Sequence, residues 1–175
     1  MTTSFIIPTL QTQRLILRAP SERDVAPETA FWASERSRFV GGPKPAHEVW
    51  RVIAGYLGHW ALRGYGFFAL DDKATGAYLG RAGFWHPGDW PEREIGWSLM
   101  AEAEGKGYAT EAALACRAYA YETLGWTTAI SSLDDDNDAS RAVAERLGCT
   151  FERTHDFPGG YTMNIYRHPG SEVLQ

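Results

Sequence analysis

The segment that most limits how this chain can fold is Glu104-Gly105-Lys106-Gly107-Tyr108-Ala109. It lies between a short β-type run, residues 94–99, and a stretch in which small and apolar residues recur at helical spacing, residues 108–124. The N-terminus of a helix leaves backbone N–H groups without partners and carries partial positive charge, so it attracts phosphate groups. Glycines let the backbone approach such an anion, and Lys106 adds a positive charge. The segment therefore predicts an anion site where a helix follows a strand.

Spacing separates three interpretations of these glycines. A P-loop needs Gly-x-x-x-x-Gly-Lys-Ser/Thr, and the sequence has no such run. A Rossmann fingerprint needs a third glycine where Thr110 stands, and its first glycine follows the strand almost directly, whereas residues 100–104 intervene here. An acidic run at residues 134–136 lies about where a ribose-binding residue is expected, so the Rossmann interpretation is weakened and stays open. Taken alone, the two glycines are equally compatible with an ordinary turn.

The rest of the chain alternates short β-type runs with helical patterns. The β-type runs predict strands at 15–18, 66–70, 78–85, 94–99, 127–133, 150–153 and 163–167. Capping residues, helical spacing and terminal glycines predict helices at 21–33, 49–60, 108–124 and 137–147. This order predicts one α/β (α+β) domain, with a mixed, mostly antiparallel central sheet of about seven strands and about four flanking helices.

Length and charge limit the classes of protein and partner. The length fits one domain spanning residues 1–175, with a core at about 10–168 and short tails. The net charge of -5 argues against nonspecific binding to nucleic acid or to an anionic membrane, and it favours cationic partners such as a polyamine or a basic peptide. No stretch approaches 18 apolar residues, and the N-terminus does not resemble a signal peptide. We therefore expect a soluble chain with no nucleic-acid or membrane partner.

The cysteine and histidine positions indicate neither a disulfide framework nor a metal site. Cys116 and Cys149 are the only cysteines, and they lack Cys-x-x-Cys spacing. The five histidines are not spaced as metal ligands. We therefore expect a reducing, cytoplasmic setting and no metal.

Three segments of the sequence together resemble the GCN5-related N-acetyltransferase (GNAT) superfamily. Residues 94–99, followed after five residues by 105–112, closely resemble its acyl-CoA-binding motif. Residues 137–148 and 13–18 are similar to the second motif and the opening strand of the ribosomal-protein N-terminal acetyltransferase branch. The matches lie in the right order and span nearly the whole chain. The resemblance implies a GNAT fold, acetyl-CoA as co-substrate, and direct transfer of its acetyl group to a primary amine.

The resemblance also implies which residues hold acetyl-CoA. In the family, backbone groups matching those around Leu99 and Ala101 hold the pantetheine arm like an added strand, and the loop matching 104–109 binds pyrophosphate through its amides. Glu104 departs from the family pattern. Because a carboxylate repels pyrophosphate, we expect the Glu104 side chain to be a solvated surface group that points outward. The implied cofactor-binding residues are Leu99, Ala101, Glu104, Gly105, Lys106, Gly107, Tyr108, Ala109, Thr110, Asn137, Ser140 and Arg141.

Glu94 matches the position from which some family members supply a general base. A lysine-like amine with a pKa of about 10.4 is neutral only about once in 2,500 molecules at pH 7, whereas an α-amine near pKa 8 needs far less help from a base. Many members protonate the departing thiolate with a tyrosine that is Ala144 here, so Ser140 is the expected substitute. The alternatives are a surface ion pair of Glu92, Glu94 or both with Arg93 or a neighbour, and helix capping alone for Asn137 and Ser140.

Aromatic residues in the variable helices and turns are candidates for the acceptor site, because ligand pockets are commonly lined by aromatics, although most aromatics form core. Glu92 alternates with Glu94, so both carboxylates are expected on one side of a strand. The expected substrate-binding residues are Trp32, Phe39, Trp85, Trp90 and Glu92. The acceptor, a small amine or a peptide N-terminus, and the choice between monomer and homodimer stay open. The alternative function is a non-catalytic acyl-CoA-binding or interaction module of the same fold.

Overall fold

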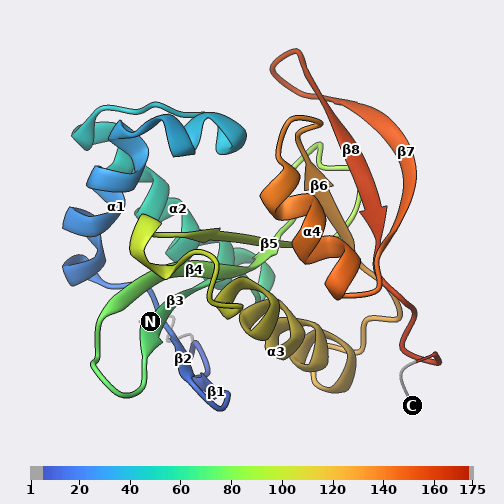
Figure 1. Ribbon diagram of the computed structural model, residues 1–175, viewed down its shortest axis with the longest axis horizontal. Helices are drawn as coiled ribbons and strands as arrows, with labels where there is room; N and C mark the ends of the chain where they lie inside the picture. Colours follow the sequence, from blue (N-terminus) through green and yellow to red (C-terminus); the bar gives the residue numbers. More distant parts are fainter. Residues whose placement is uncertain (1–5, 174–175) are drawn as a thin grey trace.

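The computed structural model describes residues 6–173, which form one mixed sheet with helices on both faces (Figure 1). In Figure 1, α3 and α4 lie in front of the sheet and α2 lies behind it. The α-helices are α1 (Val25–Ala33), α2 (Ala46–Arg63), α3 (Tyr108–Glu122) and α4 (Asp138–Arg146), and the 3₁₀-helices are η1 (Glu22–Asp24), η2 (Glu35–Val40) and η3 (Ala101–Ala103). The strands are β1 (Leu10–Gln11), β2 (Leu15–Arg18), β3 (Phe67–Asp72), β4 (Tyr78–Trp85), β5 (Glu94–Leu99), β6 (Ile130–Leu133), β7 (Thr150–Phe157) and β8 (Tyr161–Arg167).

The sheet has the order β1-β2-β3-β4-β5-β6-β8-β7, and every neighbouring pair is antiparallel except β5 with β6. The predicted mixed, mostly antiparallel α/β fold is therefore confirmed. β1, an eighth strand of only two residues, is too short to give a periodic signal in the sequence. The strand predicted at 127–133 begins only at Ile130, whereas the one predicted at 150–153 continues to Phe157.

The parallel pair β5–β6 is joined over a very short length. Its one pair of register partners is Glu94 and Ile130, where the N–H of Ile130 donates to the C=O of Arg93 at 3.0 Å. One residue further, the Ser131 hydroxyl donates to the C=O of Ile95 at 2.6 Å. Beyond this point the two strands diverge (Figure 1). The sheet therefore opens at its centre, with strand backbone on both sides of the opening.

Helix α3 lies close to the sheet because its inner face is made of small side chains. Ala112, Ala113, Cys116 and Ala120 are fully buried and belong to the main core, together with the aromatic ring of Phe84 on β4. Small residues let a helix backbone approach the layer beneath it, and α3 packs against β4 and β5. The N-terminus of α3 is thus fixed beside the strand that borders the opening.

Within residues 6–173, the helices lack the long apolar stretch that crossing a bilayer demands. The same residues hold no group of three or more His, Cys, Asp or Glu side chains placed to bind a metal ion.

Candidate active site

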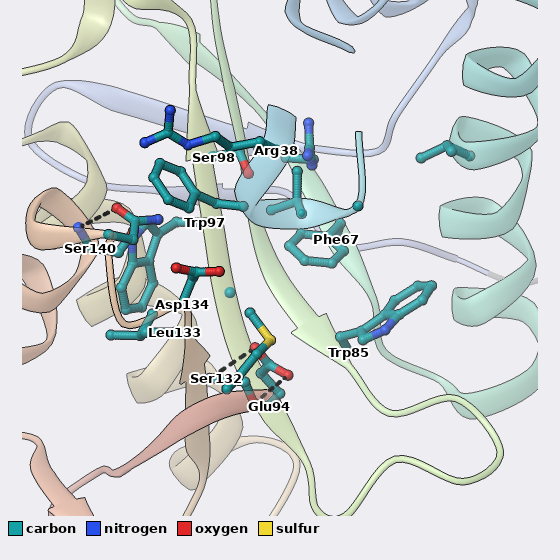
Figure 2. Close-up of a pocket in the computed structure, with 18 of the residues that line it drawn as sticks. Arg38, Phe67, Trp85, Glu94, Trp97, Ser98, Ser132, Leu133, Asp134 and Ser140 are labelled. Atoms are coloured by element: carbon teal, nitrogen blue, oxygen red, sulfur yellow. Dashed lines mark hydrogen bonds between the residues drawn. The ribbon is translucent and has the colours of Figure 1, made fainter. Parts of the chain in front are cut away.

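A cavity of about 810 Å³ lies where β5 and β6 separate (Figure 2). One wall comes from η2 and α2, and the other from β5, the end of β6 and the start of α4. In Figure 2, Glu94 and Ser132 lie at one end of the site, and Arg38 and Ser98 lie at the other. Seven of the residues predicted from the sequence line this cavity: Trp32, Phe39, Trp85, Trp90, Glu94, Asn137 and Ser140.

Glu94 is a buried carboxyl group at the point where the strands part, with 8% of its surface exposed. Ser132 N–H donates to its Oε1 at 3.1 Å, and Ser132 Oγ and Trp90 Nε1 donate to its Oε2 at 3.2 and 2.5 Å. Burial raises the pKa of Glu94 to about 7, although the three donors act in the opposite direction. No cation among residues 6–173 forms an ion pair with it, so the surface ion pair is excluded. A carboxyl group with this pKa exchanges protons readily near neutral pH.

Ser140 lies in the first turn of α4 and faces Trp97 of β5. Trp97 Nε1 donates to Ser140 Oγ at 3.3 Å, which leaves the serine hydroxyl proton free for another acceptor. Asn137 is the N-cap of α4, and its Oδ1 accepts from the N–H of Ser140 at 3.1 Å, so its capping role is established by the geometry. Ala144 is fully buried in the core. Ser140 is therefore the hydroxyl-bearing residue that α4 contributes to the cavity.

The predicted aromatic residues serve the packing of the cavity wall as well as lining it. Trp85 stacks on the buried ring of His59 at 5.1 Å between centroids, and Trp90 packs on Phe157 at 4.6 Å. Phe39 carries the guanidinium of Arg38 over its ring, with the guanidinium carbon 4.4 Å from the centroid. These contacts limit the rotamers of the rings, so the aromatic surface is largely preformed.

Glu92 and Arg141, two further predicted residues, do not line the cavity. β5 begins at Glu94, so Glu92 lies before the strand and does not alternate with Glu94 along it. Arg167 donates to both carboxylate oxygens of Glu92, at 2.6 and 2.8 Å, and Arg153 lies 3.1 Å from one of them. The expected placement of the Glu92 carboxylate beside that of Glu94 is therefore wrong, because the Glu92 carboxylate forms ion pairs with these two arginines instead. Arg141 forms an ion pair with Asp138 of its own helix.

The loop before α3 has the backbone form that an anion site requires. Gly105 and Gly107 have φ values of +71° and +81°, in the left-handed region that glycine adopts without strain. Gly107 is the N-cap of α3, and no side chain caps the helix. The backbone N–H groups of the first turn are thus left for another partner.

Side chains from distant segments hold this loop in place. Arg14 Nη1 donates to the C=O of Lys106 at 2.9 Å, and its guanidinium carbon lies 4.5 Å from the centroid of the Tyr108 ring. Glu104 forms an ion pair with Arg36 of η2. Glu104 is exposed, as the sequence predicted, and the ion pair adds a feature that the sequence did not show: Arg36 neutralises the charge that would repel a phosphate.

The other residues expected to bind the cofactor lie around the same loop and offer mainly backbone. Leu99 ends β5 and is buried, and Ala101 is exposed in η3. Ala109 is buried in the core, so only its main chain faces the loop. Thr110 differs, because its buried hydroxyl has no hydrogen-bond partner among residues 6–173.

Comparison with known families decides what kind of protein has this fold and cavity. Residues 14–150 match the family described as Acetyltransferase (GNAT) domain. The chain belongs to the GNAT acetyltransferase family. Membership confirms the resemblance that was drawn from residues 13–18, 94–112 and 137–148. The matched region contains all three segments except residue 13.

The chain is also similar to individual proteins and solved structures. The uncharacterized protein YkkB of Bacillus subtilis (strain 168) is 33% identical over 159 residues, covering 83% of this chain and 87% of that protein. The crystal structure of an acetyltransferase from Agrobacterium tumefaciens str. C58 is 39% identical, covers 96% of this chain and 98% of its own, and has a TM-score of 0.86. A ribosomal L7/L12 alpha-N-protein acetyltransferase in complex with coenzyme A shares the fold at 21% identity, with coverages of 93% and 98% and a TM-score of 0.73.

One feature of this GNAT cavity had no signal in the sequence. Arg81 of β4 is buried in the wall, where its Nη1 donates to Glu28 Oε2 at 2.6 Å. The same carboxylate accepts from Trp32 Nε1 at 3.0 Å and Tyr78 OH at 2.5 Å. Arg81 interrupts an otherwise apolar strand and Glu28 lies in an apolar helix, but 53 residues separate them, so only the fold reveals the pair.

Proposed function

We propose that this protein is an N-acetyltransferase that moves the acetyl group of acetyl-CoA to a primary amine by direct transfer, with both substrates bound together. The observation that carries the proposal is Glu94, a buried carboxyl group with a pKa of about 7 that faces the cavity where β5 and β6 part. A group of this kind is a suitable base for an amine that must lose its proton before it attacks a thioester.

The donor side of the site fits acetyl-CoA. The left-handed glycines and uncapped N-terminus of α3 suit a pyrophosphate, and the pairing of Arg36 with Glu104 removes the local charge that would oppose it. The diverging strands leave backbone groups that a pantetheine arm can pair with as an added strand. Acetyl-CoA supplies the thioester, and this chain supplies backbone groups that orient it.

The acceptor side explains how the amine becomes reactive. Glu94 takes a proton from the amine, whose nitrogen then forms the bond to the acetyl carbon. As the carbon–sulfur bond breaks, the thiolate takes up a proton by way of the Ser140 hydroxyl, which hydrogen-bonds to the sulfur and regains a proton from solvent as it gives its own away. A thiol with a pKa near 8.5 is a good leaving group, so Ser140 contributes less than Glu94.

The cysteines are unsuited to carry the acetyl group. Cys116 and Cys149 are both buried, and burial raises the pKa of the Cys149 thiol to about 11 and that of the Cys116 thiol further still. A buried thiol with a raised pKa is a poor nucleophile at neutral pH. Transfer through a covalent acetyl-enzyme is therefore not part of the proposal. Two free thiols also suit the cytoplasm, which we propose as the location.

For the acceptor class we propose a peptide or protein N-terminus ahead of a side-chain amine. A free α-amine with a pKa near 8 needs only about 1.4 kcal/mol to become neutral at pH 7, against about 4.6 kcal/mol for a lysine-like amine. The fold is shared with the ribosomal L7/L12 alpha-N-protein acetyltransferase and with a ribosomal-protein-S5-alanine acetyltransferase from Vibrio fischeri; both names specify a protein acceptor, and the first specifies its α-amine.

The test is thiol release from acetyl-CoA with a panel of peptides, polyamines and amino sugars. We expect turnover with at least one α-amine, and a rate about 100-fold lower for Glu94→Gln. Glu145→Gln, an exposed change of the same kind on α4, is the matched control and keeps the wild-type rate. Tight binding of CoA with no turnover on any amine would instead favour a non-catalytic acyl-CoA-binding module.

A further inference from the structure

Most of the charged side chains that line the cavity are sorted by sign between its two walls; the exception is Glu48 of α2, which lies 3.9 Å from Lys44 on the cationic wall. On one wall, Arg38 lies in η2, Arg51 lies in α2, and Lys44 lies in the segment between them. Glu94 and Asp134 come from β5 and the end of β6. We propose that the acceptor is an amine that also carries an anionic group, which Arg38 and Arg51 bind while Glu94 receives the amine. This inference rests on the function proposed above.

Arg38 and Arg51 are the cations of this wall whose charge is not compensated by a nearby carboxylate among residues 6–173. Neither has a carboxylate within 4.0 Å among residues 6–173, whereas Lys44 lies 3.9 Å from Glu48. The guanidinium of Arg38 rests on the Phe39 ring, which orients it without neutralising it. Arginine presents several N–H donors in a planar fork that matches a carboxylate or a phosphate.

The fourth cation of the lining, Arg81, does not share this role. Its side chain is almost completely buried, and Glu28 lies 2.6 Å from its Nη1. The aromatic rings of Phe31 and Trp32 flank its guanidinium, with its central carbon 4.9 and 5.2 Å from their centroids. Arg81 is therefore compensated inside the wall, and the charge offered to a ligand comes from Arg38 and Arg51.

The opposite wall suits the amine end of the same molecule. Asp134 has no cation within 4.0 Å among the residues that the structure describes, and in Figure 2 it lies between Trp97 and the pair formed by Glu94 and Ser132. A protonated amine is attracted to this wall and then gives up its proton to Glu94. Aromatic surface between the walls, including Phe67 and Trp85, lowers the local dielectric and strengthens both interactions.

This local arrangement differs from what the net charge of the chain suggests. A net charge of -5 favours cationic partners in general. A polyamine, however, would place a second cation against Arg38 and Arg51, where like charges repel. The cavity therefore selects against polyamines and in favour of an acceptor with an amine at one end and an anion at the other.

The experiment compares acceptors that differ only in charge. The probes are alanyl-phenylalanine, its C-terminal amide and spermidine, each with saturating acetyl-CoA, and thiol release gives kcat/KM. We expect the free acid to exceed the amide about tenfold and spermidine to be the poorest. Arg38→Gln combined with Arg51→Gln should lower kcat/KM for the acid about tenfold, leave the amide unchanged, and leave the KM for acetyl-CoA unchanged. Arg146→Gln, an exposed change on α4, is the control.

Four results would overturn the inference. Equal rates for acid and amide, or faster turnover of spermidine, would leave the proposed function standing and refute the anionic acceptor. A raised KM for acetyl-CoA in the arginine variants would assign these cations to the donor instead. Binding of acetyl-CoA with no thiol release from any of the three probes would count against the proposed function itself, and the inference would fall with it.

Discussion

At the scale of single residues, two opposing effects set the pKa of Glu94. Burial favours the neutral carboxylic acid, whereas three donors from Ser132 and Trp90 favour the carboxylate. The balance leaves its pKa at about 7. Removing one donor should therefore change the pH at which the enzyme becomes active, because a base acts only when it is deprotonated.

Trp90→Phe tests this balance. Phenylalanine keeps the packing on Phe157 but cannot donate to Glu94 Oε2, so the pKa of Glu94 should rise and the midpoint of the pH–rate curve should move up by about one pH unit. The measurement is thiol release between pH 5.5 and 9. Trp50→Phe, on the exposed side of α2, is the control and keeps the wild-type midpoint. An unchanged midpoint in Trp90→Phe would show that this hydrogen bond does not tune Glu94.

At the scale of elements, the site depends on β5 parting from β6 and on the glycine loop before α3. Gly107 has a φ of +81°, and a Cβ added there would meet Arg14 Nη2 at 3.5 Å, an ordinary contact. Space is thus available, and the difficulty for another residue is the left-handed backbone.

Gly107→Ala should therefore act through the backbone of the loop. We expect a loss of about 1 kcal/mol in the free energy of unfolding and a severalfold higher KM for acetyl-CoA, because the amides at the start of α3 are turned. Gly58→Ala on α2 is the matched control, since its φ is not positive and no atom lies within 4 Å of the added Cβ. That variant should be slightly more stable. If both variants had the same KM for acetyl-CoA, the glycine loop would have no role in binding the donor.

The sequence predicted these elements because their signals are local. Gly105, Gly107 and Asn137 each mark a helix start by their own chemistry, and the structure has α3 and α4 beginning there. Pairs between distant segments gave no such signal. Trp97 and Ser140 are 43 residues apart, and the pairing of Arg36 with Glu104 joins η2 to the loop. These contacts arise only when the sheet brings their elements together.

At the scale of the whole molecule, the buried carboxyl group that serves the proposed chemistry lowers stability. Glu94 has a folded-state pKa of about 7 against an ordinary value of 4.5. Below pH 4.5 the group is protonated in both states, and the fold carries no penalty. As the pH rises through 7, the unfolded chain holds a solvated carboxylate while the folded protein must bury one, so the stability that the neutral group allowed is lost.

Glu94→Gln removes this pH dependence, because glutamine does not ionise. We expect the free energy of unfolding of the wild type to fall relative to the variant between pH 4.5 and 8, by up to about 3 kcal/mol. Urea unfolding at pH 5 and pH 8 measures the difference. Glu145→Gln should follow the wild type at both values. A wild type and a Glu94→Gln variant with parallel pH dependence would mean that Glu94 is not held at a raised pKa.

The most direct test of Glu94 as the base for acetyl transfer is the pH dependence of kcat/KM for a peptide α-amine, with the acceptor concentration expressed as its protonated fraction. The wild-type rate should rise with pH through a midpoint near 7 and then level off. The Glu94→Gln variant should be about 100-fold slower at pH 8 and show no such midpoint. A Glu94→Gln variant that keeps the wild-type rate and midpoint would contradict the assignment.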